Sequence, residues 1–90
     1  MVQVAWTRRA LAELRAIRDY IAQFSPLAAQ RLSNRLIAAA RSLETEPDRG
    51  RPVRGGRREL VAIRPYLIRY IRLEGRVVIQ ELRHGSQEPD

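Results

Sequence analysis

The chain has 90 residues, which predicts a single domain over residues 1–90 without a large catalytic cleft. Seventeen basic residues against ten acidic ones give a net charge of +7, and every basic residue is arginine. This excess predicts an anionic partner, whether nucleic acid, an acidic protein or a membrane surface. Cysteine is absent and His84 is the one histidine, so disulfides, thiolate zinc sites and histidine-based metal clusters are excluded. We expect no metal and no cofactor.

The chain has no apolar run near the roughly 18 residues that a membrane span needs, and its first residues are too few and too polar for a signal peptide. We therefore expect a soluble cytoplasmic protein that does not interact with membranes.

The first half of the chain predicts a strand followed by two helices. Residues 2–6 alternate apolar and polar side chains, as a strand does. Thr7 can cap a helix, and Ser25 with Pro26 ends this helix and starts a second one that runs to about Leu43. The apolar stripe of the first helix is Ala10, Leu11, Leu14, Ile17, Ile21 and Phe24, and that of the second is Leu32, Leu36, Ala39, Ala40 and Leu43. The two helices are predicted to form an antiparallel hairpin.

The second half predicts a loop and three strands. Residues 47–56 are rich in proline, glycine and arginine and read as a loop. Strands are predicted at 59–64, 67–73 and 76–83, joined by two-residue turns at Pro65-Tyr66 and Glu74-Gly75. The predicted fold class is therefore α+β, in the order β-α-α-β-β-β, with an antiparallel sheet packed against an N-terminal helical hairpin. The position of the first strand in the sheet stays open.

A two-residue turn at Glu74-Gly75 fixes the pairing of the last two strands. Leu73 then faces Arg76, Ile71 faces Val78, Arg69 faces Gln80 and Leu67 faces Leu82, while the pairs Tyr70–Ile79 and Arg72–Val77 point to the opposite face. One face must pack on the helices, so apolar side chains mixed with arginine remain on the other face. Such a surface suits a partner, although scattered exposed apolar residues in a small domain would look the same.

Several short segments stand out by their order and spacing. They are Trp6-Thr7, Tyr20-Ile21, Ser25-Pro26, Ala28-Ala29, Leu43, Gly50-Arg51-Pro52-Val53, Arg58-Glu59-Leu60-Val61, Pro65-Tyr66-Leu67-Ile68-Arg69-Tyr70 and His84-Gly85. Together they resemble the RelE/ParE superfamily of toxins from bacterial toxin-antitoxin pairs, and more closely its ParE arm. The resemblance covers nearly the whole chain. It implies a toxin that is neutralised by a ParD-like antitoxin, whose disordered segment folds against the toxin.

The two arms of this superfamily differ in their targets. The resemblance to the ParE arm implies inhibition of DNA gyrase, whereas RelE-like toxins cleave messenger RNA on the ribosome. The ribonuclease arm tends to have arginine where this chain has Leu67 and Gly85, and a tyrosine beyond the last residue of this sequence. These departures favour binding over catalysis. His84 is the catalytic candidate if the nuclease alternative holds, because an imidazole can act as an acid or a base; otherwise it ends the last strand.

The remaining candidates are arginines and their apolar neighbours. Five arginines lie between residues 49 and 58 and form either a solvated loop or a basic loop that contacts nucleic acid or acidic side chains. Candidate antitoxin-binding residues are Arg58, Arg69, Arg83, Leu67 and Ile71, and candidate target contacts are Arg51, Arg54, Arg57 and His84. Tyr66 and Tyr70 are interpreted as sheet packing with the hydroxyl in water.

Charge alone also suggests a simple nucleic-acid-binding module. Aromatic residues do not interleave with the arginines as they do in proteins that stack bases. We therefore expect no direct, specific binding of nucleic acid.

Overall fold

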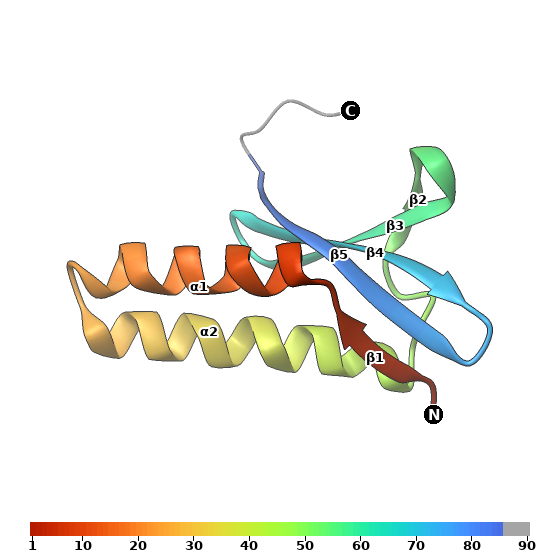
Figure 1. Ribbon diagram of the computed structural model, residues 1–90, viewed down its shortest axis with the longest axis horizontal. Helices are drawn as coiled ribbons and strands as arrows, with labels where there is room; N and C mark the ends of the chain where they lie inside the picture. Colours follow the sequence, from red (N-terminus) through yellow and green to blue (C-terminus); the bar gives the residue numbers. More distant parts are fainter. Residues whose placement is uncertain (86–90) are drawn as a thin grey trace.

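A helical hairpin covers one face of a five-stranded sheet in the computed structural model, which describes residues 1–85 (Figure 1). The elements, in chain order, are β1 (Gln3–Trp6), α1 (Arg8–Ala22), α2 (Pro26–Arg41), the short 3-10 helix η1 (Ser42–Glu44), β2 (Arg51–Val53), the turn η2 (Arg54–Gly56), β3 (Arg57–Ile63), β4 (Tyr66–Leu73) and β5 (Arg76–His84). The predicted α+β class and helical hairpin are confirmed. No helix within residues 1–85 is long and apolar enough to cross a membrane.

The predicted caps define the hairpin. The Thr7 hydroxyl accepts a hydrogen bond from the Ala10 amide at 3.1 Å, and the Ser25 hydroxyl accepts one from the Ala28 amide at 3.1 Å, with Pro26 in the first turn. These bonds satisfy amide groups that a helix start otherwise leaves without a partner. The second helix ends at Arg41, slightly earlier than predicted, and Leu43 is buried in the 3-10 turn that follows.

The apolar stripe of α1 is buried at one end only. Ala10 and Leu14 lie in the core, whereas Leu11 is partly exposed and Phe24 is 72% exposed. Phe24 lies beyond the end of α1, where its ring forms a T-shaped pair with the Tyr20 ring. The hairpin extends past the sheet (Figure 1), so its tip has no layer to pack against. Phe24 was predicted to continue the apolar stripe, but it lies outside the helix and outside the core.

The sheet is mixed rather than fully antiparallel. Its strand order is β1-β5-β4-β3-β2, and β1 pairs with β5 in parallel while the other neighbours are antiparallel. The long helical connection after β1 permits this parallel pairing, which a short turn cannot. The antiparallel arrangement predicted for the last three strands is confirmed, and β1, whose position was left open, joins the sheet in parallel.

The predicted loop at 47–56 contains the short edge strand β2, which pairs with the start of β3. Pairing with β2 begins β3 at Arg57, two residues earlier than predicted. The next turn consists of Arg64 and Pro65, because Tyr66 already pairs with Ile63. The turn predicted at Pro65-Tyr66 is thus wrong by one residue, and the one at Glu74-Gly75 is confirmed.

A β-bulge changes the predicted pairing of β4 with β5. Near the turn the four predicted pairs are confirmed, but the register shifts between Arg69 and Tyr70. Beyond this point Arg69 pairs with Glu81 rather than Gln80, and Leu67 pairs with Arg83 rather than Leu82. Gln80 is the extra residue of β5. A bulge of this kind turns the following side chains to the opposite face of the strand.

The core lies between the sheet and the two helices. Its largest fully buried side chains are Tyr70, Leu36, Leu43, Ile68, Ile79 and Val77. The Tyr70 hydroxyl donates a hydrogen bond to the Pro47 carbonyl and accepts one from the Gly50 amide, both at 2.8 Å. It is therefore not in water, contrary to the prediction. A side chain at Gly50 would collide with the Tyr70 ring, so this position requires glycine.

Candidate functional site

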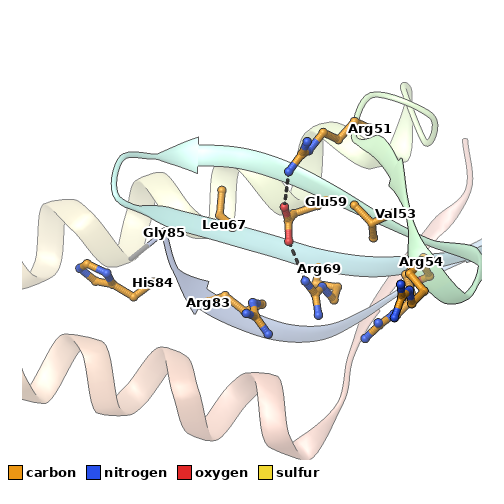
Figure 2. Close-up of a pocket in the computed structure, with 10 residues that line it drawn as sticks. Arg51, Val53, Arg54, Glu59, Leu67, Arg69, Arg83, His84 and Gly85 are labelled. Atoms are coloured by element: carbon orange, nitrogen blue, oxygen red, sulfur yellow. Dashed lines mark hydrogen bonds and ion pairs between the residues drawn. The ribbon is translucent and has the colours of Figure 1, made fainter. Parts of the chain in front are cut away.

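The open face of the sheet, opposite the helices, carries a pocket of about 400 Å³. Its lining residues come from β2, the η2 turn, β3, β4 and β5 (Figure 2), and they are Arg51, Val53, Arg54, Arg57, Glu59, Leu67, Arg69, Arg83, His84 and Gly85. Half of them are arginines. We call this the arginine pocket.

A buried ionic network forms the floor of the arginine pocket. Arg69 on β4 is 4% exposed, and its guanidinium contacts the carboxylates of Glu59 at 2.9 Å and Glu81 at 3.3 Å. The other oxygen of Glu59 contacts Arg51 at 3.1 Å, and Glu81 also contacts Arg83 at 3.2 Å. Figure 2 shows Glu59 lying between Arg51 and Arg69. Each buried carboxylate therefore holds Arg69 together with an arginine nearer the rim.

The bulge at Gln80 brings Glu81 into this network. Continued regular pairing would have placed the neutral Gln80 opposite Arg69. The bulge also frees backbone groups of β5, and α1 satisfies them: Thr7 donates to the Gln80 carbonyl, and the Leu82 amide donates to Glu13 at 3.0 Å. Glu13 also forms an ion pair with Arg9, four residues earlier, at 3.4 Å. The start of α1 thus stabilises an irregular strand that the pocket needs.

The two arginines around Glu59 control its ionisation. Burial alone raises the pKa of Glu59, but hydrogen bonds and charges from Arg69 and Arg51 outweigh burial. The pKa of the Glu59 carboxyl therefore lies below its ordinary value. Glu59 is consequently a carboxylate across the neutral range and a weak base.

The η2 turn brings two arginines to one end of the pocket. Gly55 and Gly56 have φ angles of 81° and 73°, which side chains disfavour, so the chain reverses tightly between Arg54 and Arg57. The Arg57 Nε donates a hydrogen bond to the Arg54 carbonyl at 3.1 Å. This bond holds the Arg57 guanidinium against the backbone of the turn, whereas the Arg54 residue is exposed.

His84 lies at the other end of the pocket, away from Arg54 (Figure 2). Its ring and the Tyr66 ring form a T-shaped pair, with centroids 5.6 Å apart. Beyond it lies a second hollow of about 440 Å³. Its lining is mostly apolar and consists of Glu13, Ala16, Ile17, Tyr20, Tyr66, Leu82 and His84. His84 therefore stands at the junction between a basic pocket and this apolar hollow.

The structure brings most of the predicted site residues together. Candidates for antitoxin binding and for target contact share the arginine pocket, namely Leu67, Arg69 and Arg83 with Arg51, Arg54, Arg57 and His84. Two candidates lie outside it. Arg58 donates to the Asp48 and Gly50 carbonyls and forms an ion pair with Asp48, and the partly buried Ile71 pairs with Arg57 and Val78.

Sequence reasoning missed the two carboxylates that organise the pocket. Glu59 precedes Leu60 in the alternating pattern of β3, so its orientation toward the open face was readable from the sequence. Glu81 was not, because the predicted register placed Gln80 opposite Arg69.

Within residues 1–85, no group of three or more histidine, aspartate or glutamate side chains is placed to hold a metal ion. The arrangement is suited to binding anions.

Comparisons with known proteins agree with this fold over almost the entire chain. A family model described as the ParE toxin of type II toxin-antitoxin system, parDE, matches residues 4–89. The chain is 56% identical over 87 residues to Toxin RelE2 of Caulobacter vibrioides (strain ATCC 19089 / CIP 103742 / CB 15), covering 97% of this chain and 99% of that protein. It is 35% identical to the putative toxin Y4kP of Sinorhizobium fredii (strain NBRC 101917 / NGR234), covering 96% and 91%.

Among solved structures, a chain of the chromosomal ParDE TA system from P. aeruginosa superimposes with a TM-score of 0.82 at 26% identity. The superposition covers 93% of this chain and 96% of that one. The predicted resemblance is confirmed: the chain belongs to the ParE toxin family of type II toxin-antitoxin systems.

Proposed function

We propose that this toxin inhibits DNA gyrase by binding to it, and that a ParD-like antitoxin neutralises the toxin by covering the arginine pocket and the apolar hollow. The family match makes the chain a toxin of a type II pair, and the name of the similar ParDE system supports an antitoxin of this type. The target and the contact residues are the proposal.

The observation that carries the proposal is that arginines bind both carboxylates of the pocket. Cleavage of RNA needs a base to activate a hydroxyl and an acid to protonate the leaving oxygen. Glu59 and Glu81 are each held by arginines, and the lowered pKa of Glu59 makes it a weak base. His84 lies at the opposite end from Arg54 and against Tyr66. This arrangement supports binding rather than acid-base chemistry.

The arginine pocket and the apolar hollow together suit the binding of an antitoxin. A segment with acidic and apolar side chains can place carboxylates against Arg83 and the exposed Arg54, and apolar groups on Leu67 or in the hollow beyond His84. Candidates for gyrase contact, Arg51, Arg54 and Arg57, line the same pocket. One bound antitoxin would then exclude the target without any change in the toxin fold. Arg58 and Ile71 would contact the antitoxin only at its periphery.

Paired activity assays on the purified chain test this proposal. We expect the chain to inhibit supercoiling by gyrase and to leave messenger RNA intact on translating ribosomes. Adding the product of the neighbouring antitoxin gene should restore supercoiling at a one-to-one ratio with the toxin. Ribosome-dependent cleavage that disappears in His84→Ala would overturn the proposal and establish the RelE-like nuclease instead. Unaffected supercoiling by the active chain would also overturn it.

A further inference from the structure

The second half of β5 has an open side that the start of α1 covers. β1 pairs with β5 at residues 76–79, and beyond this point no strand within residues 1–85 lies on that side. Backbone groups there still need hydrogen-bond partners. The Thr7 hydroxyl donates to the Gln80 carbonyl at 3.0 Å. The Glu13 carboxylate accepts from the Leu82 amide at the same distance. Side chains of α1 and its cap therefore take the place of a neighbouring strand.

The same part of α1 also reaches the ionic network of the pocket. The Arg9 guanidinium contacts the Glu13 carboxylate at 3.4 Å and the Glu81 carboxylate at 3.2 Å. The other oxygen of Glu81 contacts Arg69 at 3.3 Å and Arg83 at 3.2 Å. Glu81 thus uses one oxygen toward the helix and one toward the pocket. A continuous series of contacts leads from Glu13 on the helix to Arg83 in the pocket.

The bulge in β5 determines which side chains face the pocket. In a regular register every side chain beyond the bulge would point to the other face of the sheet, so Glu81 and Arg83 would leave the open face. Burial of Leu82 in the core also favours the bulge, so the strand does not depend on the helix alone. Glu13 fixes the displaced strand through its bond to the Leu82 amide. Loss of this bond should loosen the bulge without unfolding the domain.

We propose that Glu13, acting with Arg9, is a positioning residue for antitoxin binding. Its role rests on the proposed function, in which a carboxylate of the antitoxin binds Arg83. Neither Glu13 nor Arg9 lines the arginine pocket, so both act on this contact through β5 and Glu81. Glu13 is the main link, because the Arg9 side chain is 68% exposed and water screens its ion pairs.

Two substitutions of Glu13 separate positioning from direct contact, which is needed because Glu13 also lines the apolar hollow. Glu13→Ala removes the acceptor for the Leu82 amide, whereas Glu13→Gln keeps an acceptor oxygen and loses the charge. Both variants make the chain more positive, so general electrostatics would tighten the binding of an acidic partner. Weaker binding would therefore have a local cause.

NMR spectroscopy of the full chain without antitoxin tests the position of Arg83. In Glu13→Ala we expect the Leu82 amide to exchange its hydrogen about tenfold faster, because it loses a bond to a charged acceptor. The Arg83 Nε–H signal should shift. Glu13→Gln should keep most of the Leu82 protection and shift the Arg83 signal less. An unchanged Arg83 signal in Glu13→Ala would overturn the proposal.

Calorimetric titration with the product of the neighbouring antitoxin gene tests the consequence. Glu13→Ala should weaken binding about tenfold, because the loosened Arg83 must be ordered when the antitoxin binds. Glu13→Gln should recover most of the affinity. Equal weakening in both variants would mean that the antitoxin contacts the Glu13 charge directly, and would overturn the proposal.

The matched control is Glu46→Ala, which removes an exposed carboxylate outside both the pocket and the hollow. It should leave the Arg83 signal and the affinity unchanged, and circular dichroism should show that all variants are folded. Equal weakening in Glu46→Ala would also overturn the proposal. A natural chain that binds no antitoxin would overturn the proposed function, and the Arg83 signal of Glu13→Ala would still decide whether the helix positions this arginine.

Discussion

The two faces of β4 differ completely in how they are stabilised. Ile68 points to the helices and is fully buried among apolar side chains, whereas its neighbour Arg69 points to the open face and is 4% exposed between two carboxylates. Ile68 gains free energy by leaving water. Arg69 loses its hydration on burial and recovers this cost only through Glu59 and Glu81.

This difference separates stability from function within one sheet. Apolar residues in place of Arg69, Glu59 and Glu81 together would meet the demands of folding at least as well, since a complete buried ionic group is often no more stabilising than apolar replacements. What the ionic network provides is position: its carboxylates hold Arg51 and Arg83 at the pocket. The helix-facing side stabilises the domain, and the open side maintains a rigid cationic surface.

The largest expected effect is on the helix-facing side. Ile68→Ala removes a fully buried side chain from the core and should lower the free energy of unfolding by about 4 kcal/mol, through lost burial and the cavity left behind. Urea denaturation followed by circular dichroism measures this loss. It should be the same at neutral and acid pH, because no charge is involved. A strong pH dependence would contradict the apolar account of this face.

A slightly smaller effect is expected on the open side. Arg69→Met leaves Glu59 and Glu81 in the buried floor without their shared partner and should cost about 3 kcal/mol at neutral pH. In acid the cost should shrink, since protonated carboxyls no longer need a counter-charge. Urea denaturation at both pH values measures the change.

The exposed Arg31 provides the control for Arg69→Met, and Arg31→Ala should change stability by less than about 0.5 kcal/mol. A cost at Arg69 that is equally large in acid would mean that lost packing, rather than the ionic network, accounts for it.

Local sequence patterns predicted the elements that local interactions stabilise. The caps at Thr7 and Ser25 and the turn at Glu74-Gly75 are short-range features, and all three are present. The parallel pairing of β1 with β5 was missed because it depends on contacts far apart in the chain. The short strand β2 pairs with the neighbouring β3, but its segment is rich in proline, glycine and arginine, which is typical of a loop. Phe24 fits the period of the apolar stripe and is nevertheless exposed, because periodicity cannot show where a helix extends beyond the layer that covers it.

The candidate site was predicted in part for the same reason. Arg69 and Arg83 were both candidates and both line the pocket, but the predicted register placed them on opposite faces of the sheet, and the bulge brings Arg83 to the face of Arg69. The bulge at Gln80 is stabilised by Thr7 and Glu13, more than 60 residues earlier in the chain, so no local pattern reveals it. Without the bulge the role of Glu81 is invisible, and the arginines look like a scattered surface charge rather than an organised pocket.

The smallest effect tests the ionic network through a single carboxylate. Glu59→Gln keeps the shape and one acceptor oxygen but removes the charge that Arg69 and Arg51 bind, and should cost about 1 to 2 kcal/mol at neutral pH. The pKa of Glu59 is lowered in the folded chain, so its contribution is present above the ordinary carboxyl pKa and lost as the pH falls through the lowered value. The stability of Glu59→Gln should therefore converge with that of the natural chain in acid. Urea titrations across this range, with the exposed Glu46→Gln as control, measure the convergence. A constant difference at every pH would mean that Glu59 contributes packing alone, and the open face would then resemble the helix-facing side after all.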